Sequence, residues 1–391
     1  MISIEVQYFS FNKILLFAVG LWPYQRTKLV QFRLIFFLTI LITFVLFQLT
    51  AFLTLKCTSD LVVKILSTMF SYNIIITKYV SFALNMENVK KLLIQLQHVH
   101  DRLQDRYEKA IMDKYGYTGK RYTVALIIFG VFSTFIPIAV DFFMMPSGIL
   151  PINNSQTRRI QYTMEYFVDQ EKYITLILIH INVAFCLGLF ALIASGTMFF
   201  VYFQLTCGMF KISSYRIKRA INISILENVK IKNEKVMFKG IIYAVDMHRQ
   251  AMRLSNMFMS KFEITMFFLI LFGVASVSLN LFQIGPSMSA SNIKELFILF
   301  IFVVICVLYM FLANYTGQNV IDHTTNIFVT AYNVQWYRTP IYIQKVILFL
   351  LQRRTKNFTL NLKGIFIGSF ECFAMLVKVS VSYFAVIYSI K

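Results

Sequence analysis

Two charged residues, Glu371 and Lys378, lie within the last apolar run of the chain. They are seven residues apart, so a helix would carry them on one face. An ionised side chain at the centre of a membrane helix costs about 2.5 to 3.5 kcal/mol unless water or a partner meets it. Two interpretations stay open: this helix faces a wet pathway or another subunit, or both residues find partners in the bundle or extend to the interface.

The sequence contains no pattern that indicates catalysis or metal binding. It has no glycine-rich phosphate loop and no nucleophile motif with a placed base. His98 and His100 would point to different faces of a helix, and none of the five histidines has metal-ligand spacing. The five cysteines lie far apart and give no disulfide framework. We therefore expect no enzyme, no cofactor and no metal.

One short motif is treated as a coincidence. Asp105, Arg106 and Tyr107 match the acidic-Arg-Tyr triplet of G-protein-coupled receptors. In those receptors the triplet ends the third helix, whereas here it follows the second apolar run. A three-residue match outside its structural context carries little information.

The elements that must position these residues are membrane helices. Of the 391 residues, 58% are hydrophobic and 14% are charged, which is far from the balance of a soluble domain. A helix needs about 20 apolar residues to cross the hydrocarbon core, and open backbone is not tolerated there. The sequence has seven such runs: Leu34 to Leu55, Leu61 to Leu84, Tyr122 to Met144, Ile174 to Phe203, Phe262 to Ile284, Ile293 to Thr316 and Gly364 to Ile390.

The distribution of basic residues predicts the orientation. Of the 38 Lys and Arg residues, 29 lie in the N-terminal segment and in the links after runs two, four and six, and six lie on the other side. Because basic links stay in the cytoplasm, we expect a cytoplasmic N-terminus and an extracellular C-terminus. The net charge of +20 is then explained by orientation, and no nucleic acid partner is expected.

The fold class predicted is therefore all-α, a polytopic membrane protein with helical extensions in the cytoplasm. From Met86 to Arg106, apolar residues recur at helical spacing, and a short helix is predicted over 340–354. The expected organisation is a cytoplasmic segment 1–33, helices one to four over 34–203 with an extension 85–121 and an extracellular loop 145–173, extensions 204–261, helices five and six over 262–316, an anchor region 317–363 and helix seven over 364–391.

This topology predicts the positions of three further charged residues and of one sequon. Lys64 and Asp141 are expected to extend to the outer interface, and Lys78 to the inner one. The sequon at Asn153 lies in the predicted extracellular loop, where glycosylation is permitted.

The outer halves of helices two, three, four and six could enclose an apolar cavity for a small volatile ligand, although each residue could equally be ordinary packing. The candidate ligand-binding residues are Met69, Tyr72, Asn73, Phe132, Phe135, Ile136, His180, Ala184, Phe302 and Tyr309.

Two segments near the C-terminus carry a resemblance to a known family. The segment Ala331-Tyr332-Asn333-Val334-Gln335-Trp336-Tyr337 and the later Ser382-Tyr383-Phe384 resemble the insect odorant receptor family, as does the overall layout of the chain. The resemblance implies a ligand-tuned subunit of a nonselective cation channel. Four subunits, including coreceptor subunits, would surround a pore lined by the last helix.

The resemblance also assigns roles to individual residues. Val386, Ser389 and Ile390 match the extracellular pore constriction, and the apolar pair Val386 and Ile390 shares a helix face that could gate by dewetting. Tyr332, Trp336 and Tyr337 match the cytoplasmic anchor between subunits. The implied partners are coreceptor subunits, a volatile ligand, permeant cations and membrane lipid, in the plasma membrane of olfactory sensory neuron dendrites. Alternatives are a gustatory-type receptor channel, a G-protein-coupled receptor and, more weakly, a transporter.

Overall fold

The computed structural model describes residues 3–25, 27–54, 57–144, 164–169, 172–226, 230–289, 293–352, 359–362 and 366–390. In this part of the chain, seven helices are long and apolar enough to cross a membrane, which confirms the predicted number of spans. They are α3 (Lys28–Leu49), α5 (Ser59–Leu84), α7 (Arg106–Met144), α8 (Ile174–Leu226), α9 (Lys230–Ser289), α10 (Ile293–Asn333) and α12 (Phe370–Ile390).

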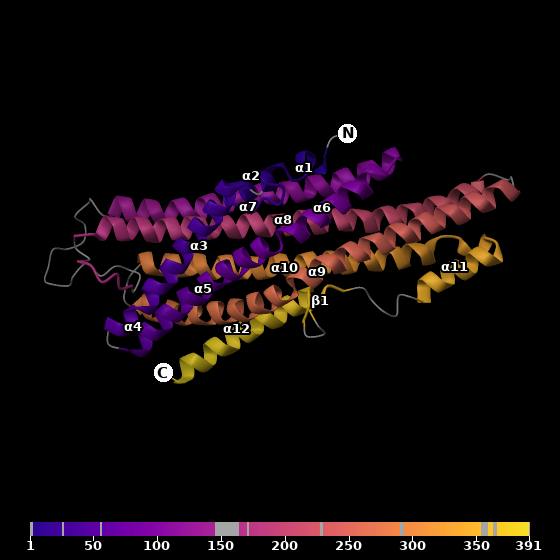
Figure 1. The fold of residues 1–391 in the computed structure, drawn as a ribbon. Helices are drawn as coiled ribbons and strands as arrows, with labels where there is room; N and C mark the ends of the chain where they lie inside the picture. The colour runs from indigo at the N-terminus through magenta and orange to yellow at the C-terminus, as the bar shows by residue number, and fades with distance from the viewer. Residues whose placement is uncertain are drawn as a thin grey trace.

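Several of these helices are much longer than a bilayer. The 60 residues of α9 extend over about 90 Å at 1.5 Å per residue, whereas a hydrocarbon core is about 30 Å thick. The additional turns of α8, α9 and α10 run side by side beyond the spans (Figure 1). We call this the extension end. The opposite end, where α8 begins and α12 finishes, is the loop end. The predicted helical extensions are confirmed.

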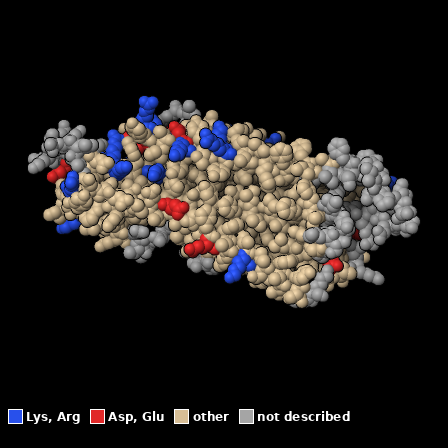
Figure 2. Space-filling view, turned by 180° about the vertical axis from the view of Figure 1, so that it is seen from behind, with Lys and Arg blue, Asp and Glu red and all other residues tan. Residues whose placement is uncertain are grey.

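Figure 2 shows that most Lys and Arg side chains on its visible face lie over the half of the molecule with the extension end, while the tan surface beyond the middle carries few charged side chains. This is the segregation that the sequence count predicts. An uncharged surface of this kind suits contact with lipid.

The predicted extension of the second span is a separate helix, α6 (Met86–Asp101), which begins after Asn85. Its apolar face is buried as the periodicity predicts. The buried residues are Val89, Leu92, Leu93, Leu96 and Val99, followed by Leu103 after the helix end.

The N-terminal segment packs into the bundle, which the sequence did not reveal. It forms α1 (Ile4–Gln7) and α2 (Ser10–Ala18), and α2 lies against α7 and α8. Tyr8 and Trp22 are almost fully buried. Burial and a hydrogen bond to Asp113 raise the pKa of the Tyr8 phenol well above its usual value. The side chain of Thr27 then caps α3, so this helix begins at Lys28 and not at Leu34.

The region before the last span also differs from the prediction. A short helix, α11 (Ile341–Gln352), matches the one expected over 340–354, and the 3-10 turn η1 (Trp336–Arg338) precedes it. Then β1 (Asn361–Leu362) pairs antiparallel with β2 (Phe366–Ile367), with Asn361 opposite Ile367. Because Phe366 and Ile367 are in a strand, the start of the last helix at Gly364 was wrong, and α12 begins at Phe370.

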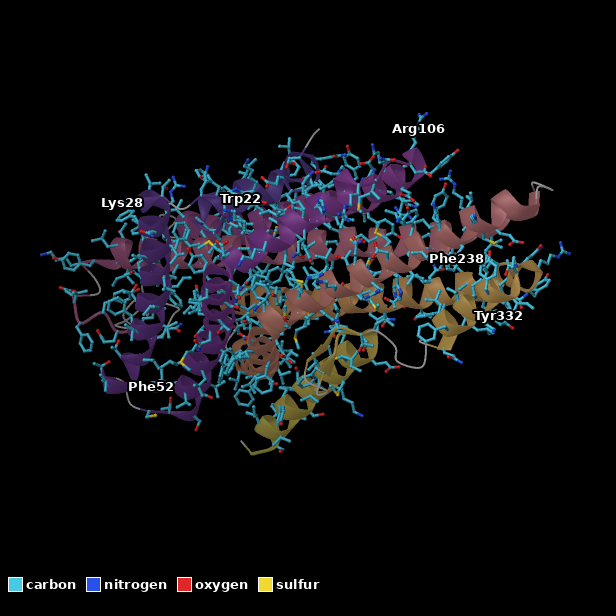
Figure 3. The ribbon with its side chains drawn as sticks, turned by 45° about the vertical axis from the view of Figure 1, so that its right-hand side comes forward. Trp22, Lys28, Phe52, Arg106, Phe238 and Tyr332 are labelled. Carbon is cyan, nitrogen blue, oxygen red and sulfur yellow. The ribbon has the colours of Figure 1, made fainter. Side chains whose placement is uncertain are left out.

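The remaining short element is α4 (Ala51–Thr54), which continues from α3 at the loop end. In Figure 3, Lys28 and Phe52 mark the two ends of the α3 and α4 segment.

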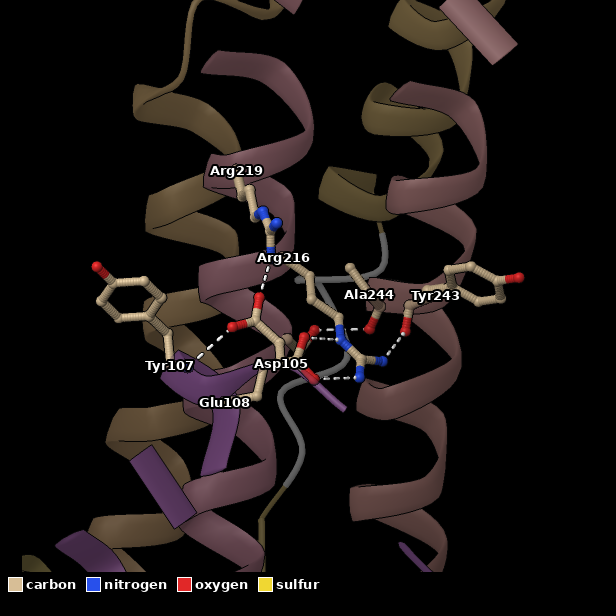
Figure 4. A network of polar contacts seen from close by, with 8 residues as sticks. Asp105, Tyr107, Glu108, Arg216, Arg219, Tyr243 and Ala244 are labelled. Atoms are coloured by element: carbon tan, nitrogen blue, oxygen red, sulfur yellow. Dashed lines mark hydrogen bonds and ion pairs between the residues drawn. The ribbon is translucent and has the colours of Figure 1, made fainter. Parts of the chain in front are cut away.

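The triplet at Asp105 has a structural role. The Asp105 carboxylate accepts a hydrogen bond from the Tyr107 amide at the start of α7 and pairs with Arg219 on α8 (Figure 4). Next to it, Arg216 donates to both oxygens of buried Glu108, at 2.6 and 2.7 Å, and to the Tyr243 carbonyl on α9. These charge-assisted bonds hold α7, α8 and α9 together at the extension end.

Candidate functional site

A cavity of about 190 Å³ lies between the spans. Lys78 of α5 forms part of its wall, together with segments of α7, α8, α9 and α10, the hairpin and the first turns of α12. On α5, Lys78 is about 28 Å from Ser59 at the helical rise of 1.5 Å per residue. The cavity therefore lies toward the extension end of the membrane region and away from the loop end. An apolar cavity of about 150 Å³ is large enough for benzene, so this one suits a small ligand.

Lys78 is 2% exposed and does not reach the interface, so the expectation that it extends to the inner interface was wrong. Its ammonium donates a hydrogen bond to the hydroxyl of Tyr309 on α10. It also lies 4.1 Å from the centroid of the Tyr309 ring and 5.4 Å from that of Phe199. Contacts with aromatic faces partly compensate a buried cation.

The other polar side chains of the wall are bonded within their own helices or to a neighbour. Thr197 donates to the Ile193 carbonyl and accepts from Asn12 of the N-terminal segment. Asn314 donates to the Met310 carbonyl. These groups stabilise the wall of the cavity, which is otherwise mainly aliphatic and aromatic.

Glycines in the cavity wall allow neighbouring segments to approach closely. Gly130, Gly196, Gly317 and Gly368 all line the cavity. A Cβ at Gly317 would lie 2.3 Å from the carbonyl oxygen of Gly368, so α10 and the segment before α12 touch through their backbones. No larger residue fits there without movement.

The cavity is directly connected to the start of α12. Cys372 and Leu376 of α12 are buried and form part of the wall. Beside them, the Asn314 side chain accepts from the Ser369 amide and the Gln318 side chain accepts from the Phe370 amide, both at 3.3 Å. Side chains of α10 thus satisfy free N–H groups at the first turn of α12. A change in the position of α10 would be transmitted to α12.

Of the ten predicted ligand-binding residues, only Tyr309 lines this cavity. Phe132, Phe135 and Ile136 are 61%, 66% and 41% exposed, so they lie on the surface of α7 and not in the wall of this cavity. Met69 and Asn73 are half-buried on α5 and are not in the cavity wall. A ligand site at these residues, nearer the loop end, stays a prediction.

The other predicted residues meet in a packed group that we call the outer cluster. Tyr72, Ala184 and Phe302 are buried together with Leu41, Phe44 and neighbouring residues of α3 and α8. His180 packs beside them: its Nε2 lies 3.2 Å from the Thr43 hydroxyl and its Nδ1 lies 2.8 Å from the Tyr166 hydroxyl. The rings of Phe44 and Tyr72 stack at 3.9 Å. Tyr72, His180, Ala184 and Phe302 therefore do lie together, but outside the wall of the cavity around Tyr309.

The outward face of α12 carries the predicted pore residues. Glu371, Lys378, Val386 and Ser389 are all exposed, on the side of the helix away from α9 and α10. Only 17% of the most apolar window of α12 is buried inside the protein, the lowest share among the seven spans. The side chain of Ile390 lies outside the described residues.

The predicted anchor residues lie at the extension end, where Figure 3 shows Tyr332 beside α11 and not far from Phe238. Tyr332 and Tyr337 are 67% and 62% exposed, whereas Trp336 packs against the main core. Exposed apolar residues continue along α11 at Ile341 and Phe349. The predicted glycosylation site Asn153 lies outside the described residues. Lys64 is half-buried, and the side chain of Asp141 is not among those described.

Fold and cavity together define a class: a multi-pass membrane protein of seven helices with an apolar cavity against its last span. Comparison with known proteins identifies the family within this class. A family model for the seven-helix odorant receptors matches residues 58–381. The chain therefore belongs to the odorant receptor family, as its C-terminal segments suggest.

Individual proteins agree with this. The insect olfactory receptor OR5 from Machilis hrabei in complex with eugenol has the same fold, with a TM-score of 0.78, 14% identity, and coverage of 99% of this chain and 100% of that one. A second structure of OR5 gives the same TM-score at 16% identity, covering 99% and 98%. The chain is also 24% identical to putative odorant receptor 92a of Drosophila melanogaster over 156 residues. That alignment spans 40% of this chain and 36% of the relative.

Proposed function

We propose that the chain is an odorant-binding subunit of a ligand-gated, nonselective cation channel, and that its ligand binds in the cavity around Tyr309. The observation that carries the proposal is the shared wall. Cys372 and Leu376 of α12 contact the same empty space as α5, α8 and α10. A molecule in the cavity therefore touches the helix that would line the pore.

The proposed gating step follows from the contacts at the start of α12. Ligand affinity must differ between the closed and open arrangements, or the ligand cannot shift their populations. The hydrogen bonds of Asn314 and Gln318 to the first turn of α12, and the backbone contact of Gly317 with Gly368, join the cavity wall to α12. Ligand binding would displace α10 relative to the first turn of α12. The whole of α12 would then move with that turn.

Assembly of several subunits around a pore is supported by two exposed surfaces, one on α12 and one at the extension end. Glu371 and Lys378 are exposed in a single subunit, where lipid contact would be unfavourable, and both would meet water or other subunits around a shared axis. At the extension end, Tyr332, Tyr337 and α11 present apolar surface for contacts between subunits. The eugenol complex of OR5 has the same fold. The proposed partners are coreceptor subunits, in the plasma membrane of olfactory neurons.

Co-expression with the coreceptor, with G-protein signalling blocked, tests this proposal. We expect odour-evoked cation current that persists under the block. Current that disappears under the block would indicate a G-protein-coupled receptor, and the absence of current with an odorant that binds would contradict the channel function.

A further inference from the structure

The polar end of the cavity has hydrogen-bond donors that are not matched by acceptors. Lys78 has three N–H donors, and one is used by the Tyr309 hydroxyl. The O–H of Tyr309 donates to no residue that the structure describes. Thr197, Asn314 and Thr316, also in the wall, each donate to a carbonyl of their own helix. Two N–H groups of Lys78 and the O–H of Tyr309 are therefore left for a bound molecule.

Lys78 also lacks an anionic partner. Among the described residues, no carboxylate lies within ion-pair distance of its Nζ, and its neighbours are the rings of Phe199 and Tyr309. A buried ammonium without a counter-charge is unfavourable, and an anion of suitable size in the cavity would compensate it.

The empty space beside the ammonium is the cavity itself, because Lys78 forms part of its wall. Gly196 faces Lys78, and a Cβ at this position would lie 3.2 Å from Nζ and 3.8 Å from a ring carbon of Tyr309. The absence of a side chain at 196 therefore makes room for the ammonium itself, which forms part of the cavity wall. Beyond it, the wall is formed by apolar side chains such as Leu192, Met266 and Leu376. The cavity thus has one cationic, donor-rich end and an apolar remainder.

We propose that the cavity binds a small carboxylic acid. Its carboxylate accepts hydrogen bonds from Lys78 Nζ and the Tyr309 hydroxyl, and its hydrocarbon part lies among the apolar residues. A carboxylate has two oxygens for these donors, whereas an alcohol adds another donor and an ester has no charge. The bound acid and Lys78 form either a carboxylate with an ammonium or a carboxylic acid with an amine. The net charge is zero in both cases. This inference rests on the proposed function, because it names the ligand class of that site.

The test uses the full chain in lipid nanodiscs and three probes of equal chain length: hexanoic acid, hexan-1-ol and methyl hexanoate. A ligand that binds only the folded state raises the midpoint of thermal unfolding. We expect the acid to raise it more than the alcohol or the ester. In Lys78→Met, the acid should bind at least tenfold more weakly. Lys64→Met, on the same helix but outside the cavity, should keep the full effect of the acid.

Tyr309→Phe gives a second variant that retains the ring and removes only the hydroxyl, and we expect weaker binding of the acid. Gly196→Ala should also weaken it by crowding the ammonium. The inference is overturned if the acid does not stabilise the unmodified chain, if the alcohol or ester stabilises it equally, or if Lys78→Met retains the effect of the acid.

Currents recorded with the coreceptor separate this inference from the proposed function. If hexanoic acid stabilises the chain through Lys78 but no odorant evokes current, the acid site stands and the channel function fails. If the alcohol or ester evokes current while the acid has no Lys78-dependent effect, the channel function stands and the acid site fails.

Discussion

The outer cluster and the cavity share α5, α8 and α10 but differ in the side chains that these helices contribute. In the outer cluster, the rings of Phe44 and Tyr72 stack at 3.9 Å and His180 has hydrogen-bond partners on both ring nitrogens. The cavity wall contains four glycines, and the remaining donors of Lys78 and Tyr309 have no acceptor among the residues that the structure describes. An aromatic-rich region therefore need not be a binding site. In this protein, unmatched donors distinguish the cavity from the outer cluster.

The largest effect is expected from Phe44→Ala in the outer cluster. Truncating a buried Phe typically costs about 3 to 5 kcal/mol, so thermal unfolding in detergent should occur at a markedly lower temperature and less folded protein should reach the surface. Receptors that do reach the surface should respond at an unchanged half-maximal odorant concentration. A large change in that concentration would place the ligand in the outer cluster.

Filling the cavity should change the half-maximal odorant concentration strongly and the stability less than Phe44→Ala does. Leu192→Trp puts a larger side chain at the wall and should raise the half-maximal concentration of an activating odorant at least tenfold. Its cost in stability should be about 1 to 3 kcal/mol. Dose–response curves and unfolding midpoints measured on the same preparations check both parts. An unchanged dose–response curve would show that the cavity is not used.

Gly317→Ala tests the connection between cavity and α12. Its Cβ would lie 2.3 Å from the Gly368 carbonyl oxygen, so the segment before α12 must shift, with a cost of about 1 to 3 kcal/mol. We expect a lower maximal current with little change in odorant binding. Gly285→Ala is the matched control, because a Cβ there meets nothing within 4 Å. Equal effects of both variants would contradict the proposed coupling.

The smallest effect is expected from Tyr166→Phe, which removes the hydroxyl that contacts His180 Nδ1. Loss of one such hydrogen bond should lower the free energy of unfolding by about 1 kcal/mol, with no change in odorant sensitivity. Tyr173→Phe, at an exposed position, serves as the control. A large loss of sensitivity in Tyr166→Phe alone would give His180 a role in ligand binding.

Much of the fold could be predicted from the sequence. Seven apolar runs gave the spans, and the spacing of Val89, Leu92 and Leu96 gave α6 and its buried face. The packing of Tyr8 and Trp22 could not be predicted, because it depends on contacts with distant helices. The hairpin before α12 has only two residues in each strand, which is too short for an alternating pattern.

The residues in the wall of the cavity could not be predicted in the same way, for a physical reason. Residue type does not determine which face of α7 is outward, and Phe132 and Phe135 are as suitable for lipid as for a cavity. Lys78 gave a usable signal, because a charge inside a span has a high cost without a partner or a ligand. Its distance along the helix suggested an interfacial position, and its burial and its contact with Tyr309 show that it stays inside.

A structure of the assembled receptor with an activating odorant would test the central claim most directly. We predict density for the odorant between Tyr309 and the first turns of α12, next to Lys78 and Leu376. Density beside His180 and Phe44, with the cavity around Tyr309 empty, would contradict the account.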